Sequence, residues 1–174
     1  MEIDVSQLLK APGQAIAFAF EEQWVPLEFG QEKLEFVKPV SVSGTAAKVG
    51  RLIQVKGEIR TEIRRQCGRC LEPYTFPLEV PLEVEYLPLH EVAEGPAGQE
   101  DRDKFTIFTG KAVFLDTEVK AAMVLDLPIS GLCQESCKGL CPKCGQNLNE
   151  GECQCPRGEI DPRLAVLQKL LKEV

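Results

Sequence analysis

IQVKGEIRTEIRRQCGRCLEPYTFPLEVPLEVEY, residues 53–86, is the stretch that decides the fold. Between Ile53 and Ile63, mostly apolar residues occupy the odd positions, and polar or charged residues occupy the even ones. The run from Phe76 to Tyr86 alternates just as regularly. A period of two predicts strands with one buried face. We therefore predict an antiparallel hairpin whose tip carries Cys67-Gly68-Arg69-Cys70.

Two prolines indicate where the second strand of this hairpin lies in its sheet. Pro77 and Pro81 have the same parity, so they remove backbone N–H donors from the same side of the strand. A central strand needs donors on both sides, whereas an edge strand does not. The second strand is therefore predicted to be an edge strand along these prolines.

Weaker signals outside the hairpin predict further elements. Asp116 or Thr117 caps a helix that ends before Pro128, and Asp161-Pro162 begins a closing amphipathic helix. The acidic segment 87–103, with its glycines and prolines, predicts a mobile loop, and the apolar segment 24–37 has no clear period. The remaining predictions are strands at 15–20, 40–46, 105–108 and 112–115, and a short helix at 4–9.

These elements predict an α+β fold. It is mainly an antiparallel β-sheet, with a barrel-like form as one alternative, a helix near 117–126, a cysteine-rich zinc loop and a C-terminal helix. The 174 residues and 44% hydrophobic content suit a single domain over residues 1–174. A cysteine-rich, zinc-binding subregion at 133–155 belongs to that domain.

The subregion, CQESCKGLCPKCGQNLNEGECQC, holds six of the eight cysteines. Its centre, Cys141-Pro142-Lys143-Cys144-Gly145, has the form of a zinc knuckle, in which two thiolates bind one metal across a tight turn. Cys153-Gln154-Cys155 supplies a second pair of ligands. Glycine and asparagine residues between the two pairs favour a compact loop rich in turns.

The eight cysteines divide into two sets of four, and four cysteines make a closed structural zinc site. The set within residues 141–155 is local in the sequence. The other set, which includes Cys67 and Cys70, requires the hairpin tip to contact the segment after the helix. One site that combines Cys133 or Cys137 with the knuckle is the alternative. The predicted cofactor is one or two structural zinc ions, although thiolates also suit iron. The two sets are Cys141, Cys144, Cys153 and Cys155, and Cys67, Cys70, Cys133 and Cys137.

A disulfide framework is the other interpretation of clustered cysteines, and it requires an oxidising compartment. The N-terminus MEIDVSQLLK lacks the basic and apolar regions of a signal peptide. No apolar run approaches the ~18–20 residues of a membrane span. We therefore predict a cytoplasmic protein without a membrane partner, whose cysteines bind metal.

Sequence motifs for catalysis are missing. His90, the only histidine, lies in the acidic segment, so neither a Cys–His pair nor a histidine-ligated catalytic zinc is favoured. Glycine loops of the Walker and Rossmann types are absent from the sequence. A thioredoxin-like use of Cys67 and Cys70 requires a βαβ unit, whereas their flanks predict antiparallel strands. We predict a non-enzymatic protein without a small-molecule substrate, with a thiol–disulfide oxidoreductase as the less favoured alternative.

The formal net charge of −7 is concentrated between Glu79 and Asp103, so the rest of the chain is neutral overall. A local basic surface is therefore compatible with the composition, and the first strand of the hairpin provides one. Its bases could contact RNA phosphates, but Glu58 and Glu62 between them equally predict a salt-bridged, solvated face. The candidate RNA-binding residues are Lys56, Arg60, Arg64 and Arg69.

Four motifs follow one another in a specific order. They are Cys67-Gly68-Arg69-Cys70-Leu71-Glu72-Pro73, the helix end Leu127-Pro128, the block CKGLCPKCGQNLN at 137–149, and DPRLAVL at 161–167. Together they resemble the YceD family, the large ribosomal RNA subunit accumulation proteins, over essentially the whole chain. Some members of that family lack the dense cysteine block but keep a ligand-like pair after the helix. The resemblance therefore supports joining Cys67 and Cys70 to Cys133 and Cys137.

The resemblance implies a bacterial, cytoplasmic factor that supports accumulation of 23S rRNA and thereby ribosome biogenesis, in particular assembly of the large ribosomal subunit. Its implied partners are ribosomal RNA, a large-subunit ribosomal protein, or both, and structural zinc would shape the surface that contacts them. A zinc-knuckle protein-interaction or chaperone module is the alternative function. Nothing in the sequence predicts the oligomeric state.

Overall fold

The computed structural model describes residues 1–10, 13–30 and 32–155. These residues form an α+β fold that consists mostly of antiparallel strands, as the sequence predicts. In chain order the elements are β1 (Glu2–Asp4), α1 (Ser6–Lys10), β2 (Ala15–Glu22), β3 (Leu27–Phe29), β4 (Glu32–Phe36), β5 (Val40–Val49), β6 (Leu52–Gln66), β7 (Pro73–Pro88), η1 (Leu89–Glu91), α2 (Pro96–Lys104), β8 (Thr106–Phe108), β9 (Ala112–Phe114) and α3 (Asp116–Asp126).

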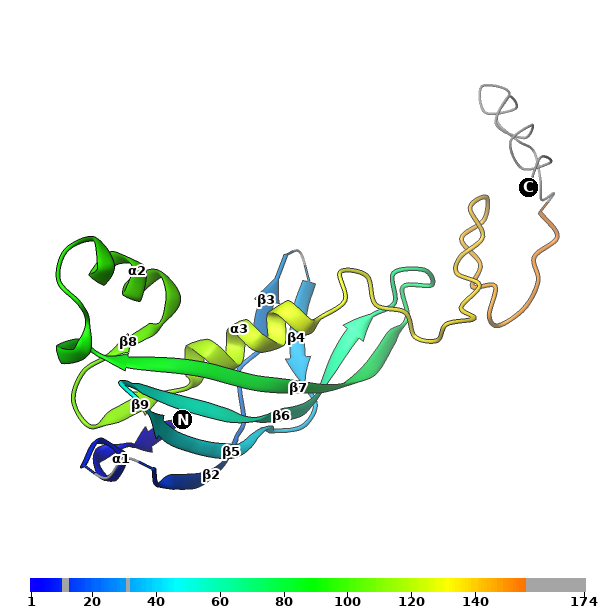
Figure 1. Cartoon of the computed structure of the whole chain (residues 1–174). Helices are drawn as coiled ribbons and strands as arrows, with labels where there is room; N and C mark the ends of the chain where they lie inside the picture. Colours follow the sequence, from blue (N-terminus) through cyan, green and yellow to red (C-terminus); the bar gives the residue numbers. More distant parts are fainter. Residues whose placement is uncertain (11–12, 31, 156–174) are drawn as a thin grey trace, which may run out of the picture.

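Strand β6 is the centre of the sheet. It pairs along its length with β7, from Ile53↔Tyr86 to Gln66↔Pro73, and on its other side with β5. Beyond the end of β5, the same side of β6 pairs with β4, and β2 pairs with the outer side of β5 (Figure 1). Among the described residues the sheet stays open, because β2 and β8 each pair with one neighbour only. The barrel-like alternative is therefore not the form that the described strands adopt.

The core lies on one face of the β6–β7 hairpin. Val55 and Ile59 of β6 are fully buried, and Leu82 of β7 is almost so, as the alternation predicts. Val119 and Met123 of α3 belong to the same buried cluster, because α3 packs its apolar side against this face. The predicted helix near 117–126 is thus confirmed as α3, and it leads the chain back toward the hairpin tip (Figure 1).

The two prolines of β7 lie at an edge of the sheet. Pro77 is opposite Glu62 and Pro81 is opposite Glu58 on β6. On its other side, β7 pairs only with β8, in parallel, from Tyr86 to Pro88. No described strand therefore lies beside β7 at the prolines, and the edge prediction is confirmed.

The segment 87–103 is not the mobile loop that its composition predicts. It contains η1 and most of α2, which begins at Pro96 after Gly95 (φ 69°). The carboxylate of Asp101, which is buried, accepts hydrogen bonds from Arg51 at 2.5 and 3.0 Å and from the Ala93 N–H at 3.0 Å. Arg51 also holds the pKa of Asp101 below its ordinary value. This long-range ion pair anchors an acidic segment that looks unstructured when taken alone.

Other short elements agree with the sequence, and the structure adds how they pair. The predicted short strands at 105–108 and 112–115 are β8 and β9, but they do not pair with each other, since β9 pairs with β1. The segment 24–37, for which the sequence predicts no element, contains the antiparallel pair β3 and β4. The predicted helix from Asp161 lies outside the described residues. No helix among the described residues is long and apolar enough to cross a membrane.

Gly57→Ala should destabilise the sheet, because Gly44 and Gly57 face each other across β5 and β6. A Cβ atom at Gly57 would lie 2.4 Å from the carbonyl oxygen of Ser43. Relieving this backbone clash should cost about 1–3 kcal/mol of unfolding free energy, measured by urea denaturation followed by circular dichroism. Gly68→Ala is the control, because its Cβ would lie 3.6 Å from the nearest atom. Equal stability of both variants would contradict this packing.

Candidate metal centres

The eight cysteines meet in two groups of four. The proximal tetrad joins two cysteines of the β6–β7 turn to two that follow α3, and the distal tetrad lies further along the chain. Within each tetrad, all four sulfur atoms lie within 4.8 Å of one another. These are the two sets that the sequence favours, and the alternative single site is not formed. The proximal tetrad is Cys67, Cys70, Cys133 and Cys137, and the distal tetrad is Cys141, Cys144, Cys153 and Cys155.

The turn between β6 and β7 positions the first half of the proximal tetrad. The Cys67 N–H donates to the Glu72 carbonyl, and the Leu71 N–H donates to the Cys67 carbonyl, both at 2.9 Å. Leu71 takes the left-handed conformation, with φ 62°, which lets this turn close tightly. Cys67 and Cys70 are consequently buried at the hairpin tip.

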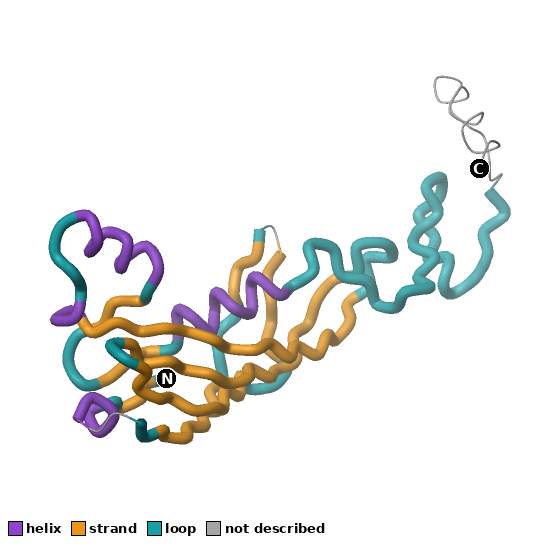
Figure 2. The backbone as a smooth tube through the Cα atoms, in the orientation of Figure 1, coloured by secondary structure: helices purple, strands orange, loops and turns teal. Residues whose placement is uncertain are grey.

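The chain after α3 is tied to this turn by hydrogen bonds that involve the backbone. The Arg65 guanidinium donates to the Pro128 carbonyl at 3.0 Å, and the Gly68 N–H donates to the Gly131 carbonyl at 2.9 Å. We call residues 128–155 the cysteine arm. It extends beyond the hairpin tip and away from the rest of the sheet (Figure 2). These contacts supply the long-range proximity that Cys133 and Cys137 need.

Arg69 is part of this connection. Its guanidinium donates to the carbonyl of Cys137 at 2.9 Å and to that of Glu135 at 3.4 Å. Its own carbonyl accepts from the Leu140 N–H at 3.1 Å. The structure therefore places this candidate RNA-binding residue against the cysteine arm, where it holds the backbone.

The distal tetrad is built around the knuckle that the sequence predicts. The Gly145 N–H donates to the Cys141 carbonyl at 2.8 Å, and the positive φ of Gly145, 75°, allows the turn. The Cys141 N–H in turn donates to the Gln146 carbonyl at 2.8 Å. Three of the four proximal cysteines are buried, whereas only Cys141 of the distal tetrad is, so the distal tetrad lies nearer to the surface.

The spacing of the sulfur atoms fits a tetrahedral metal site. The Cys67 and Cys137 sulfurs are 3.8 Å apart, and those of Cys70 and Cys133 are 3.7 Å apart. Four sulfurs around a zinc ion at about 2.3 Å are separated by roughly 3.8 Å, whereas a disulfide bond is only about 2.05 Å long. All eight cysteines are free thiols. Either tetrad could thus hold one metal ion, and both zinc and iron match the thiolate ligands.

Electrostatics in the proximal tetrad favour a cation. Burial opposes ionisation of Cys67, but backbone N–H groups, led by that of Cys70, outweigh burial and lower its pKa to about 6. The side-chain amide of Asn149 lowers the pKa of Cys137. Burial instead raises the pKa of Cys133 to about 12. Cys67 and Cys137 therefore form thiolates more readily than an ordinary cysteine, whereas Cys133 retains its proton. A metal ion bound by the tetrad would replace that proton.

The distal tetrad shows the same division. Backbone N–H groups of Cys144 and Lys143 lower the pKa of Cys141 to about 6. The hydrogen bond between the Cys155 thiol and the Cys144 sulfur, together with burial, raises the pKa of Cys155 to about 12. Cys141 is thus stabilised as a thiolate by N–H donors, while Cys155 keeps its proton. This combination is typical of a site that releases protons when it binds a cation.

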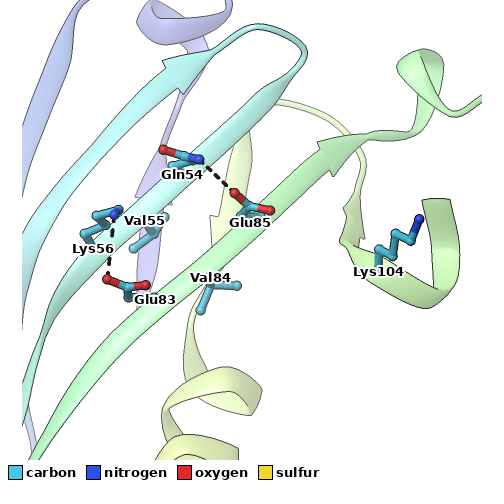
Figure 3. A pocket seen from close by; sticks show the side chains of 7 residues that line it. All are labelled: Gln54, Val55, Lys56, Glu83, Val84, Glu85 and Lys104. Atoms are coloured by element: carbon cyan, nitrogen blue, oxygen red, sulfur yellow. Dashed lines mark hydrogen bonds and ion pairs between the residues drawn. The ribbon is translucent and has the colours of Figure 1, made fainter. Parts of the chain in front are cut away.

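The candidate RNA-binding bases of β6 lie on the outer face of the sheet, beside acids. Lys56 lies 3.6 Å from Glu83, and neighbouring Gln54 donates to Glu85 at 2.7 Å (Figure 3). These residues line a hollow of about 340 Å³ that Lys104 of α2 also borders. The other two bases have acidic partners as well: Arg60 lies 2.8 Å from Glu58 and 3.9 Å from Glu79, and Arg64 lies 3.5 Å from Glu35.

The structure adds one residue that the sequence reasoning missed. Asn149 was counted among the turn-forming residues of the loop, yet its side-chain nitrogen lies 3.3 Å from the Cys137 sulfur. Its position between the two ligand pairs of the distal tetrad is the only sequence signal that could have indicated this contact. His90 is exposed in η1 and belongs to neither tetrad.

Comparison with known proteins identifies a family and several relatives. The model of the family described as "Large ribosomal RNA subunit accumulation protein YceD" matches residues 55–171, a range that contains all eight cysteines. The chain is 25% identical to "Large ribosomal RNA subunit accumulation protein YCED homolog 1, chloroplastic" of Arabidopsis thaliana. This similarity covers 78% of the chain but only 50% of the Arabidopsis protein.

Two bacterial proteins are similar over almost the whole chain. The uncharacterized protein YlbN of Bacillus subtilis is 24% identical, over 99% of this chain and 98% of its own length. An uncharacterized protein of Mycobacterium tuberculosis is 27% identical, over 98% of this chain and 81% of its own length. No solved structure matches the chain.

Metal binding should release protons at neutral pH, because Cys133 and Cys155 keep their protons until a cation is present. Titration calorimetry with Zn²⁺ in two buffers of different ionisation enthalpy should therefore give different apparent enthalpies. The affinity should also fall as the pH is lowered, because protons then compete for the thiolates. Identical enthalpies in both buffers would contradict this account of the tetrads.

Proposed function

The chain belongs to the YceD family of large ribosomal RNA subunit accumulation proteins, and we propose that it supports accumulation of large-subunit ribosomal RNA. The observation that carries this proposal is the family match over residues 55–171, which contains most of β6, all of β7 and the cysteine arm. The name of the Arabidopsis relative, which describes the same role for that protein, supports it. The expected action is cytoplasmic and non-enzymatic.

Two structural zinc ions would give the cysteine arm its shape. Four protein sulfurs complete a tetrahedral site and leave no position for a substrate, which distinguishes a structural zinc from a catalytic one. The arm has little apolar material of its own. The small buried cluster between the arm and the hairpin consists of Cys67, Cys70 and Cys137 with Tyr74, Leu132 and Leu140 around them. Such a small segment depends on metal for its folding energy.

A rigid cysteine arm that extends beyond the tip of the β6–β7 hairpin is suited to docking. Metal-bound turns present backbone and side chains in one conformation, so little ordering entropy is lost when a partner binds. The partner that fits the family is assembling large-subunit RNA or a ribosomal protein bound to it. In this proposal the tetrads position the contact surface and take no part in bond-making chemistry.

The outer face of β6 would supply phosphate contacts. Arg60 and Arg64 have side chains that are 62% and 59% exposed, and their acidic partners are exposed as well. Exposed ion pairs contribute little free energy, so a phosphate group could displace the carboxylates. A guanidinium also has more N–H donors than one carboxylate uses. Lys56 lies on the same face.

A protein partner is the second candidate, and the acids beside these bases favour it. Glu79, Glu83 and Glu85 of β7 border the same surface, opposite Arg60, Lys56 and Gln54 in the strand register. A face of mixed charge with acidic residues along one side is complementary to a basic polypeptide. In that case the protein would act as an interaction or chaperone module for a ribosomal protein.

Deleting the gene in a bacterium that encodes this chain should lower the amount of 23S rRNA relative to 16S rRNA, because large-subunit assembly would lack this factor. Quantifying both RNAs from total cellular RNA measures the effect. The wild-type chain should restore the ratio, and so should Ser136→Ala, an exposed change within the cysteine arm. Cys67→Ser with Cys70→Ser should not restore it. An unchanged ratio in the deletion strain would contradict the proposed function.

Arg60→Gln with Arg64→Gln should weaken binding of the protein to large-subunit RNA if this face contacts phosphates. Two lost contacts should reduce the slope of log affinity against log salt by about 2. Lys111→Gln with Lys120→Gln removes the same charge elsewhere and is the control. Equal affinities of the two double variants would exclude the β6 face as an RNA surface and favour the protein partner.

A further inference from the structure

Asn149 connects the two tetrads. It lies in the loop 145–152, between the two ligand pairs of the distal tetrad, yet its side-chain nitrogen contacts a sulfur of the proximal tetrad. The distance from its Nδ2 to the Sγ of Cys137 is 3.3 Å. A residue of one candidate metal loop therefore donates a hydrogen bond to a ligand of the other.

The orientation of the Asn149 amide is fixed by chemistry. The Lys138 backbone N–H lies 2.8 Å from Oδ1 of Asn149, and an N–H group can only donate. The oxygen must therefore face Lys138, which leaves the NH₂ group to face the Cys137 sulfur. The same NH₂ group also donates to Oδ1 of Asn147 at 2.9 Å. Both of its protons thus have an acceptor, one of which is the sulfur.

The distal loop holds Asn149 in this place. The Leu148 N–H donates to the Gly139 carbonyl at 2.9 Å, and the Asn149 N–H donates to the Asn147 side chain at 3.1 Å. The loop begins next to Cys144 and ends next to Cys153, two ligands of the distal tetrad. A metal ion bound there would fasten both ends of the loop and so restrict where Asn149 can lie.

We propose that Asn149 is a positioning residue through which metal binding at the distal tetrad strengthens metal binding at the proximal tetrad. Four thiolates around a divalent cation leave two excess negative charges, and an N–H donor at one sulfur stabilises them. Because coupling between two sites is reciprocal, a metal in the proximal tetrad strengthens distal binding to the same extent. This inference rests on the proposed metal binding.

The test uses the full chain loaded with ¹¹³Cd²⁺, whose NMR signal reports each tetrathiolate site separately. Cys153→Ser with Cys155→Ser removes half of the distal ligands, so the resonance that remains in this variant identifies the proximal site. Competition with a chelator then gives the proximal affinity in each variant. Asn149→Ala removes all three side-chain hydrogen bonds, whereas Asn149→Asp keeps the acceptor for Lys138 and loses the donors to the Cys137 sulfur and to Asn147. Gln134→Ala removes an amide that makes no hydrogen bond within the described residues.

We expect Asn149→Ala and Asn149→Asp each to lower proximal affinity by about 10-fold or more and to shift the proximal resonance. Gln134→Ala should leave both unchanged. The distal double variant should lower proximal affinity similarly, and adding Asn149→Ala to it should cause little further loss, because Asn149 is then already released.

Wild-type proximal affinity in Asn149→Asp would overturn the inference, because the hydrogen bond from Lys138 alone would then account for the effect of Asn149 on metal binding. Losses that add fully in the triple variant would also overturn it, since the two tetrads would then be independent of Asn149. Absence of any ¹¹³Cd²⁺ uptake by the wild-type chain would instead overturn the proposed metal binding itself. The two failures are therefore distinguishable.

Discussion

The pairing of β6 with β7 is the constraint on which the rest of the structure depends. Its register, which runs without interruption from Ile53↔Tyr86 to Gln66↔Pro73, places the alternating apolar side chains of residues 53–63 and 76–86 on the face that α3 packs against. It also ends at a turn that holds two cysteines side by side. A slip of one residue would move the core to solvent and turn these cysteines away from Cys133 and Cys137.

The cysteine arm and the sheet are held together by different interactions. The sheet is stabilised by apolar burial, whereas the arm consists of turns joined by backbone hydrogen bonds and two groups of sulfur atoms. Directed N–H groups lower the pKa of Cys67 and Cys141, and in each tetrad another thiol keeps its proton. A metal ion would replace the retained protons, and it would connect the arm to the hairpin tip more firmly than the few contacts of Arg65 and Arg69.

Local patterns in the sequence were sufficient for the β6–β7 hairpin, for α3 and for the distal tetrad. They were not sufficient for β3 and β4, or for the proximal tetrad, whose joining of distant segments was supported by the family resemblance. Alternation of residues and the spacing of a knuckle depend only on neighbours along the chain, so they can be recognised without a structure. Metal binding by the two tetrads stays a prediction, as does the absence of catalysis.

Long-range partners could not be predicted in the same way. The acidic segment 87–103 contains η1 and most of α2, and Arg51, some fifty residues away, anchors it by pairing with Asp101. Arg69 resembles a surface base in the sequence, yet its guanidinium donates to the Cys137 carbonyl in the cysteine arm. Asn149 counted as a turn residue because nothing in its neighbourhood indicates that its amide reaches Cys137. Each of these three depends on a contact between segments that composition and periodicity do not relate.

The most direct test of the account is native mass spectrometry of the full chain, purified without added metal, combined with circular dichroism before and after chelation. We predict two zinc ions per chain, with loss of ordered structure in the arm and retention of the sheet when they are removed. A metal-free chain whose cysteines are oxidised in pairs would contradict the claim that metal organises the arm, and would make thiol–disulfide chemistry the better explanation of the tetrads.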